Sequence, residues 1–267
     1  MLSDSCSWLL GTRQTNATVR LFCFSHAGGH PGTYLPWQAR LGPSVEVRPV
    51  QLPGRAQRFH EPSRREFRPL CDELAKMVQR YEDLPVALFG HSLGALLAFE
   101  VARSLSLRSQ RPRHLFVSGC SAPGHRMPVR PLHELDDSEL CQELASFQGT
   151  SPAVLADREL MQLLLPVVRD DYALLHDYNY APATPLQVPL TVLSGREDSI
   201  VPANLVLPWA NETTEGCDVH WFDGGHFFID SAQSAVIECI QRKLIPGVHK
   251  VSRTTQRKSE KRGVCRV

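Results

Sequence analysis

The sequence predicts an α/β protein with a mostly parallel sheet, helices on both faces of that sheet and a helical insertion. Short runs rich in Val, Leu and Phe alternate with helical patterns along the chain, which is typical of buried parallel strands joined by helices. A length of 267 residues suits one such unit, since α/β domains often reach about 250 residues. One long stretch breaks the alternation and indicates the insertion.

Six apolar runs are the predicted strands. They lie at residues 19–25, 45–50, 86–89, 114–118, 190–194 and 219–222. Helical patterns between and after them lie at 66–81, 93–105, 204–210 and 233–244. In the first helix, apolar residues repeat every three to four positions, so they form one buried face.

The insertion is predicted as a helical lid at about 124–188. Three helices are expected, at 136–147, 156–165 and 167–176, with Pro152 and Pro166 separating them. Sites in open α/β sheets lie beyond the carboxyl ends of the strands, so the lid is expected to form the substrate pocket. The chain then divides into an N-terminal extension at 1–18, a main domain at 19–247 and a tail at 248–267.

Charge argues against a nucleic-acid surface on the fold. The net charge is +1, but the last 18 residues hold seven Lys or Arg and one Glu, so the rest of the chain is acidic. The tail has little to bury and is predicted to be disordered. A monomer is the default expectation.

Eight cysteines are scattered without a Cys-x-x-Cys pair or a histidine at metal-ligand spacing. Free thiols in a reducing cytoplasm are the favoured interpretation, with no metal and no cofactor. No run approaches the roughly 18 apolar residues of a membrane span, and residues 1–18 do not resemble a secretory signal. A cytoplasmic protein is therefore predicted.

Ser92 is the candidate nucleophile. It lies in GHSLG at 90–94, which follows one predicted strand and opens a helix. Gly-x-Ser-x-Gly at a strand-to-helix turn is typical of the α/β-hydrolase fold, because Gly90 and Gly94 remove side chains that would collide in so tight a turn. The serine hydroxyl then stands exposed at the positive end of the helix.

A serine hydroxyl needs a base, and the base needs an orienting acid. His226 is the predicted base, because it follows the last strand and two glycines that let the backbone turn. Asp198 is the predicted acid, in the loop after the fifth strand, where the fold expects it. Glu197 is adjacent and is the competing choice.

Acyl transfer also needs donors for the developing oxyanion. The backbone N–H of Leu93, directly after the nucleophile, is one candidate. Ala27, in the glycine-containing loop after the first strand, is the second, with His26 and Gly28 as alternatives. A phosphate loop is the rival interpretation of these glycines, but Gly-Lys-Ser/Thr is absent from the chain.

Together these motifs resemble the type II thioesterases that accompany polyketide and nonribosomal peptide synthetases, relatives of medium-chain fatty acyl thioesterases. The matching segments are CFSHAGG at 23–29, QLPGR at 51–55, FGHSLGA at 89–95, LPVVRDD at 165–171, GRED at 195–198 and GGHFF at 224–228. The resemblance implies hydrolysis of acyl groups from the phosphopantetheine thiol of acyl or peptidyl carrier proteins, mainly to remove stalled or misloaded units. It places Ser92, Asp198 and His226 in the catalytic triad.

Some alternatives stay open at this point. Arg55 either contacts the carrier or locks a turn, with the structural role favoured, and Asp170 and Asp171 are left out of the site as possible helix-surface charges. The rival functions are a medium-chain fatty acyl thioesterase, a general serine esterase, and an inactive hydrolase fold that serves as an interaction module.

Overall fold

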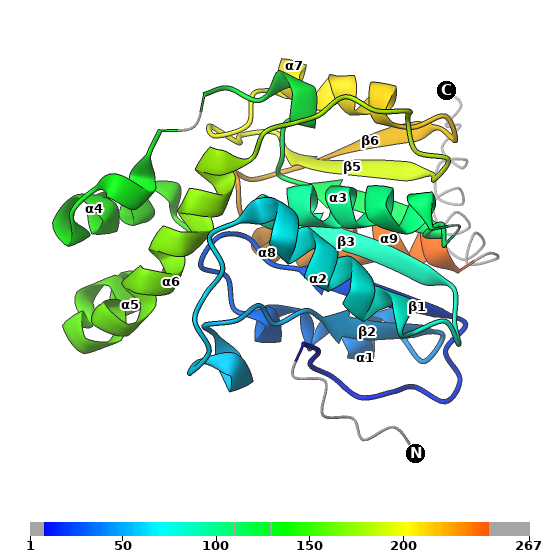
Figure 1. Ribbon diagram of the computed structural model, residues 1–267, viewed down its shortest axis with the longest axis horizontal. Coiled ribbons are helices and arrows are strands. Elements are labelled where there is room, and N and C mark those ends of the chain that lie inside the picture. Colours follow the sequence, from blue (N-terminus) through cyan, green and yellow to red (C-terminus); the bar gives the residue numbers. More distant parts are fainter. Residues whose placement is uncertain (1–7, 109, 129, 246–267) are drawn as a thin grey trace, which may run out of the picture.

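The computed structural model describes residues 8–108, 110–128 and 130–245, which form an α/β unit around a six-stranded sheet (Figure 1). The strand order is β2-β1-β3-β4-β5-β6, and every neighbouring pair is parallel. The strands are β1 (Val19–Phe24), β2 (Val45–Pro49), β3 (Val86–His91), β4 (His114–Ser118), β5 (Leu190–Gly195) and β6 (Cys217–Phe222). The predicted fold class is confirmed, and each predicted strand end lies within two residues of the observed one.

Helices cover both faces of the sheet and give it two separate cores. The helices α2 (Phe67–Gln79) and α3 (Leu93–Leu107) lie in front of the sheet in Figure 1, whereas α1 (Trp37–Leu41), α8 (Phe228–Ser231) and α9 (Gln233–Leu244) lie behind it. Side chains alternate along the strands: Phe22 and Leu88 enter the front core, and Leu21 and Phe89 enter the back core. This is the burial on both faces that the apolar runs predicted.

Short elements complete the connections. The helix predicted at 204–210 is α7 (Ala203–Val206), which continues as a 3-10 turn at Leu207–Glu212. Other 3-10 turns lie at Pro31–Tyr34, Ala56–Arg58, Pro123–His125 and Leu132–Glu134.

The insertion between β4 and β5 carries the helices α4 (Asp137–Phe147), α5 (Pro152–Ala156) and α6 (Arg158–Asp177). It has a small core of its own, which consists of Leu132, Leu140, Leu144, Met161, Leu165 and Val168. In Figure 1, α4 and α5 stand clear of the sheet, and α6 runs from them back to it. These three helices form the lid.

The predicted break at Pro166 is wrong, because α6 runs unbroken through this residue. A proline removes one helical hydrogen bond, but Leu165 and Val168 are buried on either side of it and hold the helix in place. Asp157 begins this helix by accepting a hydrogen bond from the Leu160 N–H at 3.0 Å. Pro152 is the first residue of α5 rather than a break. Proline suits this position because the N–H that it lacks would have no partner within the helix.

The described part of the N-terminal extension packs beside the end of β2. Leu9 is buried and forms an antiparallel bridge with Val50. The predicted basic tail lies outside the described residues. Within the described ranges, no helix is long and apolar enough to cross a membrane.

Candidate active site

Ser92 occupies a strained turn between β3 and α3. Its φ of 55° and ψ of −116° are values that a residue with a side chain rarely adopts. The two flanking glycines make the turn possible: a Cβ at Gly90 would lie 1.9 Å from the Gly94 carbonyl oxygen, and a Cβ at Gly94 would lie 2.1 Å from the Phe24 carbonyl oxygen. The turn therefore packs directly against β1 and presents Ser92 at the N-terminus of α3.

His226 and Asp198 form a buried pair at the ends of β6 and β5. The Nδ1 atom of His226 lies 2.8 Å from Oδ2 of Asp198, and the Asp198 side chain has no exposed surface. The other carboxylate oxygen accepts the backbone N–H groups of Ile200 and Val201 at 2.8 and 3.0 Å. Glu197, the competing acid, is exposed. The geometry thus brings Asp198 to the imidazole.

The pair sets the tautomer of His226. A carboxylate only accepts hydrogen bonds, so Nδ1 carries the proton and Nε2 is left as a proton acceptor. Two other histidines lie nearby, and burial lowers the pKa of both: that of His26 to about 4 and that of His91 well below its usual value, with the neighbouring His226 adding to each shift. His26 and His91 are therefore neutral near pH 7.

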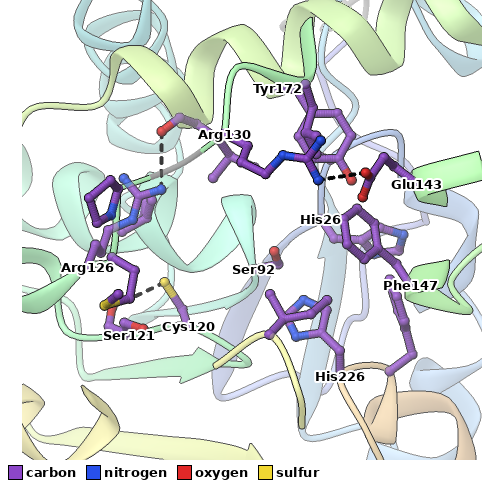
Figure 2. Close-up of a pocket in the computed structure, with 18 residues that line it drawn as sticks. His26, Ser92, Cys120, Ser121, Arg126, Arg130, Glu143, Phe147, Tyr172 and His226 are labelled. Atoms are coloured by element: carbon purple, nitrogen blue, oxygen red, sulfur yellow. Dashed lines mark hydrogen bonds and ion pairs between the residues drawn. The ribbon is translucent and has the colours of Figure 1, made fainter. Parts of the chain in front are cut away.

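Ser92 and His226 line one cavity of about 320 Å³ between the sheet and the lid. Figure 2 shows Ser92 at its centre, with His226 and His26 on one side and Cys120 on the other. The remaining lining residues are Ala27, Leu96, Ser121, Arg126, Met127, Pro128, Arg130, Leu132, Glu143, Phe147, Tyr172, Leu175, Ile200 and Phe227. Within the described ranges, Ser92 makes no hydrogen bond to His226; such contacts often tighten only when substrate binds.

Two backbone donors near Ser92 are available. Among the hydrogen bonds of the described residues, none uses the N–H of Leu93 or of Ala27, and Ala27 lines the cavity. Gly28, one of the predicted alternatives to Ala27, has its N–H engaged by Asp171 Oδ2 at 2.7 Å. The loop after β1 therefore offers Ala27 rather than Gly28.

Arg55 and Asp171 form a bidentate ion pair below the lid. Arg55 Nη1 donates to Asp171 Oδ2 at 2.9 Å and Nη2 donates to Oδ1 at 2.7 Å, and the side chains are 8 % and 1 % exposed. The favoured structural role of Arg55 agrees with this contact. The interpretation of Asp171 as a helix-surface charge is wrong, because Asp171 continues the buried stripe of Leu165 and Val168 at a spacing of three. The sequence contained a signal for this burial, because Asp171 falls on the apolar face that Leu165 and Val168 define.

Other pocket residues were not expected from the sequence. Arg130 and Glu143 form a 2.6 Å ion pair in the cavity wall, next to Tyr172 (Figure 2). The ring of Phe227 contacts His26 and His226 at centroid distances of 5.0 and 5.2 Å. Arg130, Glu143 and Tyr172 lie in segments for which the sequence offered no motif, and Phe227 lies in GGHFF beside His226 but had no predicted role.

The remaining titratable groups do not suggest a metal centre. In the portion of the chain that the structure describes, no group of three or more His, Cys, Asp or Glu is arranged to hold a metal ion. Six cysteines in that portion are free thiols, as expected: Cys23, Cys71, Cys120, Cys141, Cys217 and Cys239.

Fold and pocket together define a hydrolase of the α/β-hydrolase fold with a serine at its strand-to-helix turn. Residues 19–244 match the family model of the thioesterase domain. The chain belongs to the thioesterase family and is a thioester hydrolase.

Individual relatives cover almost the whole chain. The type II thioesterase BorB from the borrelidin biosynthetic cluster is 34% identical with a TM-score of 0.83, over 89% of this chain and 98% of that one. YbtT, a type II thioesterase from the yersiniabactin NRPS/PKS pathway, is 31% identical with a TM-score of 0.77, over 88% and 96%. LgrE of Brevibacillus parabrevis is 37% identical over 89% of this chain and 92% of its own length.

LgrE bears the name linear gramicidin dehydrogenase, which describes a different chemistry. The present sequence contains no Gly-x-Gly pair, so it lacks the dinucleotide-binding fingerprint Gly-x-Gly-x-x-Gly. A serine at a strained turn and a histidine that is paired with a buried aspartate line one cavity, and these are the features of a hydrolase instead.

Proposed function

We propose that this protein is a type II thioesterase that releases acyl groups from the phosphopantetheine arm of carrier proteins in polyketide or nonribosomal peptide biosynthesis. Its task is editing: it removes stalled or misloaded acyl groups. The similarity to BorB and YbtT supports this assignment. The partner is an acyl or peptidyl carrier protein, and the enzyme acts as a cytoplasmic monomer.

In the first step, the acyl group moves from sulfur to oxygen. Ser92 Oγ transfers its proton to His226 Nε2 and attacks the thioester carbonyl carbon, and the N–H groups of Leu93 and Ala27 hold the resulting oxyanion. The intermediate collapses with cleavage of the C–S bond. The imidazolium returns its proton to the departing sulfur, which leaves as the pantetheine thiol.

In the second step, water releases the acyl group. A water molecule gives a proton to His226 Nε2 and attacks the acyl carbon, the same two N–H groups hold the oxyanion, and the C–O bond to Ser92 breaks. Ser92 Oγ takes the proton back and the carboxylic acid leaves. Asp198 keeps the imidazole in the tautomer that both steps require.

The observation that carries the assignment of these roles is the 2.8 Å contact between His226 Nδ1 and the buried Asp198 carboxylate. It leaves Nε2 as the proton acceptor in a cavity that Ser92 also lines. The supporting observation is that, among the described residues, two N–H donors have no hydrogen-bond partner: Leu93 at the N-terminus of α3 and Ala27 in the loop after β1.

A substrate comparison tests the proposal. Hydrolysis of one acyl group is measured as its carrier-protein thioester and as its nitrophenyl ester. We expect a higher kcat/KM on the carrier thioester, and a loss of at least about 10³-fold in kcat for Ser92→Ala on both substrates. A preference for the free ester would favour a general esterase, and a marked preference for medium-chain fatty acyl carriers would favour the fatty acid role.

A further inference from the structure

The loop after β1 is fastened to the lid through one buried carboxylate. Asp171, on α6, accepts the Gly28 N–H at 2.7 Å through the same Oδ2 atom that takes Arg55 Nη1. Arg55 follows β2, and its Nη1 also reaches the Gly29 carbonyl oxygen at 3.4 Å. Three segments that are far apart in sequence therefore meet at Asp171: the loop after β1, the loop after β2 and the lid helix.

The glycines of both loops lie directly against α6. Gly28 has a φ of +72°, and a Cβ there would lie 2.8 Å from Val168 Cγ2. Gly54, with a φ of +84°, would bring a Cβ to 3.2 Å from Val167 Cγ2. Since Gly28 places no side chain between its own backbone and the helix, a shift of α6 is transmitted to the backbone next to Ala27.

The Gly28 N–H is only one peptide plane away from the proposed oxyanion donor. Because peptide units are planar, only the φ and ψ of Ala27 separate the plane that holds the Ala27 N–H from the plane that holds the Gly28 N–H. A hydrogen bond that fixes the second plane thus restricts the direction of the first. The buried side chain of Asp171 supplies that bond.

We propose that Asp171 is a positioning residue that aims the Ala27 N–H at the oxyanion through its hydrogen bond to the Gly28 N–H. The oxyanion hole is then complete only while α6 is docked on the two loops. This inference rests on the proposed role of Ala27 and deepens it, since it makes the lid a working part of the catalytic machinery as well as the wall of the pocket.

A purely structural ion pair would behave differently. Removing one partner of a buried pair leaves an unpaired charge and destabilises the protein, whereas replacing both partners by apolar side chains is often neutral or stabilising. If the pair only holds the fold, catalysis should recover whenever stability does. If Asp171 aims the Ala27 N–H, variants that keep the Gly28 hydrogen bond should keep kcat, and variants that lose it should lose kcat even when they are as stable as wild type.

Two variants separate these cases. Arg55→Met keeps the Asp171 carboxylate as acceptor for Gly28 but leaves it without its cation, so we expect a lower urea midpoint and a kcat within about threefold of wild type. Arg55→Met/Asp171→Leu should regain the urea midpoint yet lose about 10- to 100-fold in kcat, with KM within about threefold, since small misplacement of a catalytic group costs up to about 10².

A second pair of measurements applies even if the double variant folds poorly. Asp171→Glu keeps the charge but displaces the carboxylate by one methylene, and should lower kcat about tenfold while the protein stays folded. The affinity for an alkyl trifluoromethyl ketone, which forms an oxyanion with the serine, should fall by the same factor as kcat. Asp170→Asn is the matched control, because Asp170 binds Ser63 and Arg65 rather than the loop after β1; its kcat should stay near wild type.

Recovery of both stability and kcat in the double variant would overturn the inference, as would an equal loss of kcat in Asp170→Asn. All kcat ratios are measured on a nitrophenyl ester, which uses the same oxyanion hole whichever acyl donor is natural. Failure of wild type to hydrolyse carrier thioesters would therefore count against the proposed function and leave these ratios interpretable.

Discussion

The Nδ1 atom of His226 lies 2.8 Å from Oδ2 of Asp198, and the backbone N–H groups of Ile200 and Val201 hold the other oxygen of the same carboxylate. The loop that carries Asp198 therefore holds the carboxylate in position through backbone hydrogen bonds, in addition to its contact with the imidazole. Among the described residues, no lid residue hydrogen-bonds Asp198, whereas the loop after β1 is tied to the lid through Asp171.

Asp198→Asn should abolish most of the activity while preserving the fold. The amide keeps the shape of the carboxylate but can turn a donor toward Nδ1, which would favour the tautomer with its proton on Nε2 and leave no base for Ser92. We expect kcat to fall by about 10³- to 10⁴-fold. Glu197→Gln, which changes the exposed neighbouring acid, should stay within about twofold; a large loss there would contradict the assignment.

The turn at Ser92 should tolerate no side chain at Gly94. A Cβ at this position would meet the Phe24 carbonyl oxygen at 2.1 Å, and backbone cannot move aside as a flexible side chain can. We expect Gly94→Ala to lower the free energy of unfolding by more than about 3 kcal/mol, as severe overpacking does.

Gly216→Ala is the matched control for that substitution. Gly216 has a φ of +90° but no atom within 4 Å of an added Cβ, so alanine there should cost only the backbone strain, about 1 kcal/mol. Urea unfolding of both variants measures the difference. Equal losses would mean that steric exclusion at β1 is not what makes Gly94 necessary.

Most of the sheet could be predicted from the sequence because β1 to β5 are short runs that are buried almost throughout, whereas β6 is half-exposed at the edge of the sheet. The same logic failed in the lid. Pro166 was expected to end a helix, since local chemistry disfavours proline inside one, but burial of Leu165 and Val168 on the lid core outweighs that cost. Tertiary packing decided the outcome, and no local pattern contains that information.

The candidate site divides in the same way. Ser92, Asp198 and His226 each follow a strand, so their places in the fold could be predicted from motif and strand order. Asp171 and Phe227 could not be placed, because their partners are Gly28, Arg55 and His26 on distant loops. Only the docking of α6 and the last loop onto the sheet makes those contacts.

Cys120 should be inert although it lines the cavity. Burial raises the pKa of its thiol to about 12, and the thiolate is the form that reacts with alkylating agents. At pH 8 the thiolate fraction is then far too small for reaction on the scale of minutes. We expect N-ethylmaleimide to leave the activity intact and a fluorophosphonate directed at Ser92 to abolish it. If N-ethylmaleimide rapidly inactivated wild type but not the Cys120→Ser variant, the thiol would be shown to be reactive.

Stability should fall as the pH drops from 7 to 5, because the fold keeps several histidines neutral. Burial lowers the pKa of His114 from 6.5 to about 4. In the folded protein, the Nε2 atom of His114 lies 2.8 Å from Thr191 Oγ1. Below pH 6.5, His114 binds a proton in the unfolded chain, but in the folded protein it stays neutral until about pH 4. Protonation of this histidine therefore favours unfolding.

His114 lies away from the cavity, so its contribution can be removed without touching the site. At pH 5 the lowered pKa of His114 should reduce the free energy of unfolding by about 1 to 2 kcal/mol. The lowered pKa values of His26 and His91 act in the same direction. His114→Gln should therefore flatten the dependence of the urea-unfolding free energy on pH by about that amount. If the slope of the variant equals that of wild type, His114 is protonated in the folded protein and its burial does not set its charge.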